Sequence, residues 1–257
     1  MKAIDLTQPY LYDFIGRAAF PNSFNYDFQV KTVGHTITIE NQAYHYLSAI
    51  INLETHCGTH IDFPSSLFLA GKKPYDYDIS SFVCEALTVE FKKGENDHIT
   101  AEELLEKLKD VTTLKGKVLL IKTGYGKFWK TNQEKYFTNF PTLERRCTEI
   151  IADFGLVALG IDCPALDLPD FPPSFPYIVD EGANGFLQPI KDPKSTNLTT
   201  LLNANCMVIQ NLNLEKVRDK ESFILCFPPL KLEPQDSMAE KSVPVTTLPC
   251  RAFAIKE

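Results

Sequence analysis

The sequence predicts one mixed α/β domain, with a substantial sheet or barrel-like core and flanking helices. A chain of 257 residues is long enough to bury a sizeable core without disulfides. Segments with the pattern of strands outnumber those with helical spacing. A helix followed by a strand recurs over 100–123, 142–162 and 198–212. No repeat, low-complexity tract or charged linker divides the chain, so residues 1–257 are predicted to form a single domain.

The first long strands are predicted to form a hairpin. Residues 28–33 (FQVKTV) and 35–40 (HTITIE) alternate apolar with polar side chains on either side of Gly34. We therefore predict a turn at Gly34 and one solvent-exposed face. Further strands are predicted at 44–55, 86–93, 117–123, 156–162, 206–212, 222–227 and 250–255.

Three helices are predicted between these strands. Thr100 and Glu103 form a capping-box pattern that opens AEELLEKL. Residues 141–155 have helical spacing and end at Gly155, which is a typical residue after a helix. Residues 198–205 predict a short third helix.

Composition indicates a soluble cytoplasmic protein. The seven cysteines contain no CxxC pair and lie in apolar segments, which is typical of buried, reduced thiols. With 26 basic and 33 acidic residues the formal charge is −7, so a nucleic-acid partner is not expected. The apolar runs are too short to span a bilayer, and no membrane association is expected.

The stretch THCGTHIDFP, residues 55–64, carries the strongest chemical signal. If it continues the preceding strand, alternation places His56, His60 and Asp62 on one face. Gly58 lies between the histidines on that face and leaves space for an ion or a substrate. Imidazole and carboxylate together suit Zn²⁺, Mn²⁺ or Fe²⁺, and three protein ligands with an open position are typical of a catalytic metal.

Two alternatives compete with this interpretation. A helix would also align His56 with His60, but Gly58, two threonines and Pro64 disfavour one. The two histidines could also be hydrogen-bonded residues at a strand end, with Asp62 starting a turn. The shared face favours the metal site over this structural role.

A family resemblance supports the metal site. THCGTHIDFP is similar to the HxGTHxDxP signature of the cyclase family of metal-dependent hydrolases, which includes kynurenine formamidase and isatin hydrolase. Weaker similarity continues in order at 4–9, 71–82, 99–106, 117–129, 159–167, 207–212, 227–231 and 249–255. The resemblance implies a swivelling β/α/β-type fold and hydrolysis of a carbon–nitrogen bond by metal-activated water.

The family's site residues carry over only in part. His56, His60 and Asp62 match the first metal ligands. Gln210 stands where formamidases have a glutamate ligand, and its amide oxygen is a candidate fourth ligand. Ser66 stands where the family has a proton-transferring histidine.

A second metal is not expected. The family's further histidine ligand falls near Asn197 or Leu198, and neither replaces it. Two buried dications would then face a single carboxylate, that of Asp62, which is too little negative charge. We expect one divalent ion, zinc or manganese.

The missing histidine leaves the proton transfer without an obvious group. Asp162, Asp167 and Glu181 are candidates, although Asp162 could equally cap backbone N–H groups at a strand end. Ser66 can at most position water or a substrate oxygen. Cys57 is interpreted as a buried thiol. His35, His45 and His98 are interpreted as packing or surface residues.

The sequence therefore predicts a metal-dependent hydrolase of a small amide, N-formyl or cyclic lactam substrate. The alternative is a catalytically degenerate relative that binds a metal or ligand. By analogy with the family we expect a homodimer or homotetramer, and the long hairpin would suit exchange between subunits.

Overall fold

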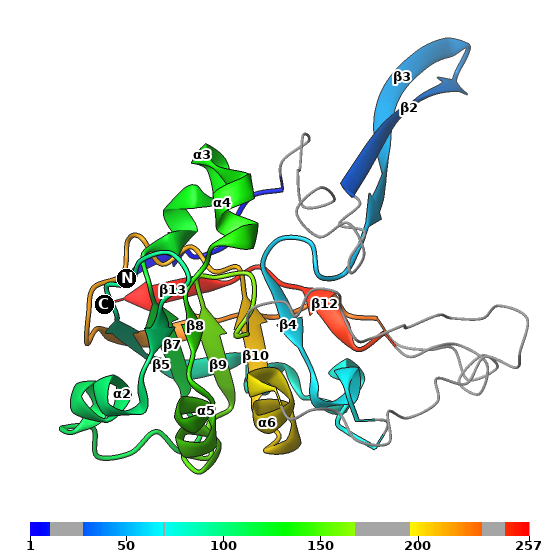
Figure 1. Cartoon of the computed structure of the whole chain (residues 1–257). Coiled ribbons are helices and arrows are strands. Elements are labelled where there is room, and N and C mark those ends of the chain that lie inside the picture. Colours follow the sequence, from blue (N-terminus) through cyan, green and yellow to red (C-terminus); the bar gives the residue numbers. More distant parts are fainter. Residues whose placement is uncertain (11–27, 69, 168–195, 233–244, 257) are drawn as a thin grey trace, which may run out of the picture.

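The computed structural model describes residues 1–10, 28–68, 70–167, 196–232 and 245–256, and it has the predicted mixed α/β fold (Figure 1). The strands are β1 (Lys2–Asp5), β2 (Phe28–Ile39), β3 (Gln42–Leu53), β4 (His60–Asp62), β5 (Val83–Glu90), β6 (His98–Ile99), β7 (Val118–Lys122), β8 (Thr142–Leu143), β9 (Ala158–Ile161), β10 (Met207–Gln210), β11 (Ser222–Cys226), β12 (Thr247–Pro249) and β13 (Phe253–Lys256). The helices are α2 (Ala101–Leu108), α3 (Phe128–Thr131), α4 (Gln133–Thr138), α5 (Arg145–Ala152) and α6 (Asn197–Asn203).

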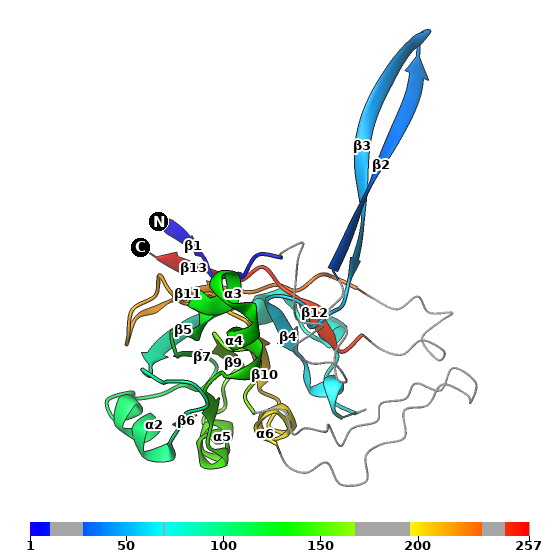
Figure 2. The same ribbon diagram turned by 45° about the horizontal axis from the view of Figure 1, so that its top comes forward.

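A curled sheet forms the body of the molecule. Its nine strands follow the order β1-β13-β11-β5-β7-β9-β10-β4-β12. The central strands β5, β7, β9 and β10 are parallel, and the strands on either side pair antiparallel. The short strand β4 lies between β10 and β12, near one edge (Figures 1 and 2).

Alternating apolar side chains bury the sheet on both faces. In β7, Leu119 and Ile121 belong to one core, whereas Val118 and Leu120 belong to the other. The first core includes residues of α2, α5 and α6, which lie on the same side of the sheet in both views. The second core lies on the opposite face of the sheet and includes residues of β11 and β13. The apolar runs read from the sequence are therefore strands that are buried on both sides.

The predicted helices form with small changes in their limits. Thr100 and Glu103 make the predicted capping box at the start of α2. In the segment 141–155 the helix begins only at Arg145, because Thr142–Leu143 pair with β6 as a strand. Among the described helices, none combines the length and apolar character needed to cross a membrane.

The strands β2 and β3 form a long arm that projects from the body (Figure 2). The predicted turn at Gly34 is wrong. Gly34 lies within β2 and pairs with Leu47, and the chain reverses at Glu40 and Asn41. Both turn residues have positive φ, 49° and 66°, as a two-residue hairpin turn requires.

Candidate functional site

The strand β4 places two of the predicted ligands side by side. His60 and Asp62 are two positions apart on an extended strand, so their side chains leave the same face. Gln210 on β10 is the cross-strand partner of His60, and Thr247 on β12 is the partner of Asp62. The sheet therefore brings residues from three distant parts of the sequence to one point.

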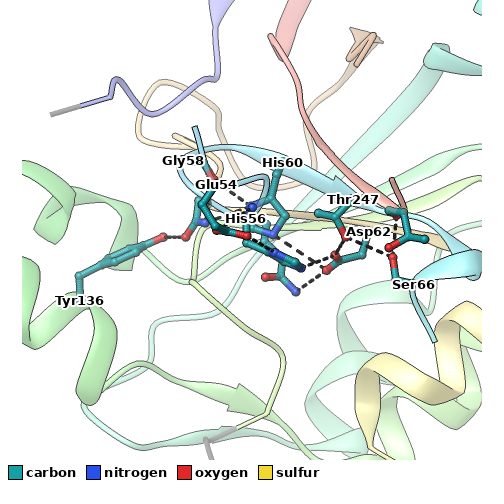
Figure 3. A network of polar contacts seen from close by, with 11 residues as sticks. Glu54, His56, Gly58, His60, Asp62, Ser66, Tyr136 and Thr247 are labelled. Carbon is teal, nitrogen blue, oxygen red and sulfur yellow. Dashed lines mark hydrogen bonds and ion pairs between the residues drawn. The ribbon is translucent and has the colours of Figure 1, made fainter. Parts of the chain in front are cut away.

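His56 joins this point from a turn. The strand β3 ends before residues 54–59, so the strand continuity assumed from the sequence does not exist. The ring of His56 nevertheless packs edge-on against that of His60, with centroids 5.3 Å apart. Its Nε2 lies 3.6 Å from Oδ1 of Asp62 (Figure 3).

Gly58 makes this turn possible. Its φ is +70°, and an added Cβ would lie 2.7 Å from Cε1 of Tyr10. The space near Gly58 is thus occupied by the Tyr10 ring, and is not left open for an ion. The Gly58 carbonyl oxygen accepts hydrogen bonds from Nδ1–H of His60 and from Nδ2 of Asn211.

Both imidazoles present Nε2 to the centre of the site. Nδ1 of His56 is 2.8 Å from Oε1 of Glu54, and Nδ1 of His60 is 2.9 Å from the Gly58 oxygen. Because these oxygens only accept, each Nδ1 carries a proton. Burial lowers the pKa of His60, so its ring is neutral at pH 7. Burial also acts to lower the pKa of His56, but the hydrogen bond to Glu54 and the charge of Asp62 raise it overall.

Asp62 is held by neutral donors on both oxygens. Nε2 of Gln210 donates to Oδ2 over 3.1 Å, and Oγ1 of Thr247 donates to Oδ1 over 2.8 Å. The amide of Gln210 therefore contacts Asp62 through its nitrogen. Within the described residues, no group of three or more histidine, cysteine, aspartate or glutamate side chains is placed so that it could hold a metal ion as it stands.

The donor chemistry nevertheless fits a divalent cation. Nε2 of His60 is buried and has no hydrogen-bond partner among the described residues, although a buried imidazole nitrogen normally has one. It lies 4.0 Å from Oδ2 of Asp62. A cation between these atoms would satisfy the unpaired nitrogen.

Ser66 lies beside this network at the end of a short 3-10 helix, Pro64–Ser66. Its hydroxyl donates to the carbonyl oxygen of Thr246 over 2.6 Å, and its Oγ is 3.2 Å from Oγ1 of Thr247. Thr247 in turn donates to Asp62. Ser66 thus reaches the carboxylate only through Thr247.

The other acidic candidates occupy structural positions or are not described. Oδ1 of Asp162 accepts from the backbone N–H and the hydroxyl of Thr123, and its Oδ2 accepts from the Gly124 N–H. Burial raises the pKa of Asp162 despite these hydrogen bonds. Asp167 accepts from the first backbone N–H groups of α6. Glu181 lies outside the described residues.

Asn197 and Leu198 have structural roles. The Asn197 side chain donates to the carbonyl oxygens of Leu143 and Leu166 and accepts from Thr148, which ties α6 to α5 and β8. Leu198 packs against the first core. Both side chains hold the helix in place.

The remaining histidine and cysteine candidates lie as expected. His35 and His45 are on the arm, where they contact Ser48 and Thr36. His98 contacts Thr142 between β6 and β8. Cys57 is 1% exposed and belongs to the first core, which confirms a buried thiol.

Four residues of the network were missed from the sequence. Glu54 could have been found, because it precedes His56 by two positions. Thr247 gave no signal, since 185 residues separate it from Asp62. Asn211 and Tyr136 were also missed: Tyr136 donates to Oδ1 of Asn211 over 2.9 Å and so fixes the amide that binds Gly58.

Comparison with known proteins identifies the family. The sequence pattern of the Cyclase family, described as "Putative cyclase", matches residues 4–168, which is more than half of the chain. The chain therefore belongs to the Cyclase family. The match includes the whole stretch from Glu54 to Ser66.

Among curated proteins, kynurenine formamidase of Geobacillus thermodenitrificans is 28% identical over 117 residues. The match covers 46% of this chain and spans only about half, 51%, of that relative.

Solved structures share the fold. Isatin hydrolase A from Ralstonia solanacearum superposes with a TM-score of 0.67 at 16% identity, covering 100% of this chain and 92% of that one. A predicted metal-dependent hydrolase from Bacillus stearothermophilus gives a TM-score of 0.62 at 19% identity, covering 98% and 97%. At these identities the likeness establishes the fold.

Proposed function

We propose that this protein is a metal-dependent hydrolase of a small amide, N-formyl or cyclic lactam substrate. The observation that carries the proposal is the unpaired, buried Nε2 of His60, which faces Asp62 beside the second imidazole. The names of the relatives, kynurenine formamidase and isatin hydrolase, support the substrate class.

His56, His60 and Asp62 would hold one divalent cation, zinc or manganese. A bound cation of this type supplies Lewis acidity and can lower the pKa of a water molecule from about 15.7 to about 7. Gln210 is the candidate fourth ligand. Because its nitrogen contacts Asp62, it would have to turn its amide to offer the oxygen.

The chain's own residues set the limits of the reaction. The neutral ring of His60 is suited to bind a cation, and Thr247 fixes the direction of the Asp62 carboxylate. Ser66 is proposed to position water or a substrate oxygen. Asp162 was a candidate for proton transfer, but its buried carboxylate is engaged by Thr123 and Gly124, so a role as proton donor is disfavoured.

A second candidate function is cation or ligand binding without catalysis. The hydrogen bond from the Ser66 hydroxyl to Thr246 favours it, because that proton is committed to the backbone. A positioned general acid or base typically contributes about 10²-fold to 10⁴-fold in rate, and Ser66 does not supply that contribution.

The test begins with elemental analysis of protein purified without a histidine tag. We expect about one zinc or manganese per chain, and loss of that metal in His60→Ala. The metal-loaded protein is then offered an N-formyl aromatic amine and isatin. Chelator-sensitive hydrolysis supports the enzyme. Bound metal without hydrolysis, together with activity gained in Ser66→His, supports the degenerate alternative. Absence of metal contradicts the hydrolase and leaves ligand binding without a metal.

We further propose that the arm mediates association of two or four copies. An isolated two-stranded hairpin is only marginally stable in water. The arm exposes large apolar side chains, which usually mark interaction sites when they cluster. These are Ile37, Ile39, Tyr44, Tyr46, Leu47, Ile50 and Ile51.

A further inference from the structure

Glu54 contacts His56 on the side opposite the candidate metal position. Its Oε1 accepts from Nδ1 of His56, and its Oε2 accepts from the His56 backbone N–H over 3.0 Å. The other ring nitrogen, Nε2, points toward Asp62 (Figure 3). The two nitrogens of the His56 ring thus face two different carboxylates, Glu54 and Asp62.

This arrangement selects one tautomer. Glu54 accepts from Nδ1 over 2.8 Å, whereas Asp62 is 3.6 Å from Nε2 and too far for a hydrogen bond, so the neutral ring keeps its proton on Nδ1 and its lone pair on Nε2. The Gly58 oxygen does the same for His60. The two histidines differ in their acceptors: Nδ1 of His60 donates to a neutral carbonyl oxygen, whereas Nδ1 of His56 donates to a negatively charged carboxylate.

The charge of Glu54 affects the net charge of the candidate metal site. Asp62 supplies one negative charge, and Gln210 supplies none. A divalent cation held by these groups would keep an unbalanced positive charge, which is costly where the side chains are buried. Glu54 places a second negative charge next to the site, because it is hydrogen-bonded to the far side of the His56 ring.

We infer that Glu54 is a positioning residue of the candidate metal site, which fixes the His56 tautomer and balances the charge of a single divalent cation. This inference rests on the proposed function. Outer partners of metal-binding histidines commonly change metal affinity about 10-fold to 100-fold when they are removed.

A purely structural role must be distinguished, because Glu54 also caps the turn through the backbone N–H of His56. Two variants do this. Glu54→Gln keeps the size and an acceptor oxygen but removes the charge, and Glu54→Ala removes both. Glu85→Gln is the matched control, because Glu85 is an exposed glutamate paired with Lys117 at a different position of the sheet.

The first measurement is the affinity for Zn²⁺ alone and Mn²⁺ alone, by competition with a chromogenic chelator. We expect Glu54→Gln to bind about 10-fold to 100-fold more weakly than the wild type, and Glu85→Gln to bind equally. The second is the ¹⁵N shifts of the His56 ring in the metal-free protein, measured at a pH high enough for the ring to be neutral despite its raised pKa. The wild type should show a single Nδ1–H tautomer, which Glu54→Ala should lose.

The outcomes separate the two proposals. If the wild type binds neither cation, the proposed function fails and this inference fails with it. If the wild type binds and His60→Ala does not, the proposed site stands. Equal affinity in Glu54→Gln, or an unchanged His56 tautomer in Glu54→Ala, then overturns the role of Glu54 alone.

Discussion

Asp62 shows at the scale of single residues how the sheet constrains a carboxylate. It is 2% exposed, and each oxygen accepts one hydrogen bond, from Gln210 and from Thr247. The β4 backbone fixes its position, while the neighbouring strands fix its rotation. A buried acceptor that loses one of these partners cannot turn to water for another.

Replacing Thr247 by valine should therefore destabilise the metal-free protein. Valine keeps the branched shape and removes the hydroxyl that donates to Asp62. Hydrogen bonds to charged groups contribute about 1.5–3 kcal/mol, and we expect a loss of that order in urea unfolding. Thr131→Val is the control, since its hydroxyl bonds within an exposed helix. Similar losses in both variants would contradict a special role for Thr247.

Gly58 offers a second test at this scale. Gly58→Ala should cost about 1–2 kcal/mol for the left-handed backbone, and more because the new Cβ would meet Tyr10 at 2.7 Å. Gly116 has φ +74° and no neighbour within 4 Å of its would-be Cβ. Gly116→Ala therefore measures the backbone cost alone. Urea unfolding should show a larger loss of stability for Gly58→Ala than for Gly116→Ala. Equal losses would mean that the Tyr10 ring moves aside at no cost.

At the scale of elements, short sequence patterns predicted the features that neighbouring residues determine. The capping box of Thr100 and Glu103 correctly located the start of α2. The turn at Gly34 was wrong because the chain turns at Glu40 and Asn41, where glutamate is an unusual residue for positive φ. The strand β12 escaped prediction because it has only three residues, and β4 was expected only as a continuation of the preceding strand.

The residues of the candidate site also divide into those predicted from a local motif and those brought in from distant segments. His56, His60 and Asp62 were readable together because they lie within seven positions of one motif. Gln210 emerged only from the family resemblance. Thr247 reaches Asp62 through strand pairing between distant segments, and no local pattern encodes that register.

The capping box should give α2 a pH-dependent contribution to stability. The hydrogen bond from Lys93, followed by that from the Thr100 backbone, lowers the pKa of Glu103. A carboxyl group with a lowered folded pKa stabilises above its unfolded pKa, and this contribution is lost as the pH falls through the folded value. Glu103→Gln should thus be less stable at neutral pH, by less than about 1 kcal/mol for so exposed a group.

Urea unfolding at neutral pH and in steps below pH 4.5, the ordinary pKa of the group, checks this expectation. The difference between Glu103→Gln and the wild type should close as the pH falls. Thr100→Ala is the companion variant: it removes the neutral half of the cap and should cost about 1 kcal/mol. A constant difference for Glu103→Gln would show that its charge contributes nothing.

At the scale of the whole molecule, the arm is the feature that the nine-stranded sheet does not explain. The β2–β3 pair forms a separate two-stranded sheet, and it leaves the body near the turn that carries Glu54 and His56 (Figure 1). Both faces expose apolar side chains, but Ile37, Ile39, Tyr44, Tyr46 and Ile50 share one face, whereas Leu47 and Ile51 lie on the other. Ile37 and Tyr44 are cross-strand partners on one face, whereas Thr38 and Ala43 are partners on the other.

The face of Ile37 and Tyr44, which carries five of the seven exposed apolar side chains of the arm, is the one expected to contact a second copy of the chain. Ile37 and Tyr44 are 43% and 46% exposed, and an association that covers them would remove this apolar area from water. Ile37→Lys with Tyr44→Lys should therefore shift the protein toward the monomer in sedimentation-velocity runs over a range of concentrations. Thr38→Lys with Ala43→Lys adds the same charge at the adjacent pair on the opposite face and should leave the assembly intact. A wild type that sediments as a monomer at every concentration, or an equal response of the two variants, would contradict association through this face.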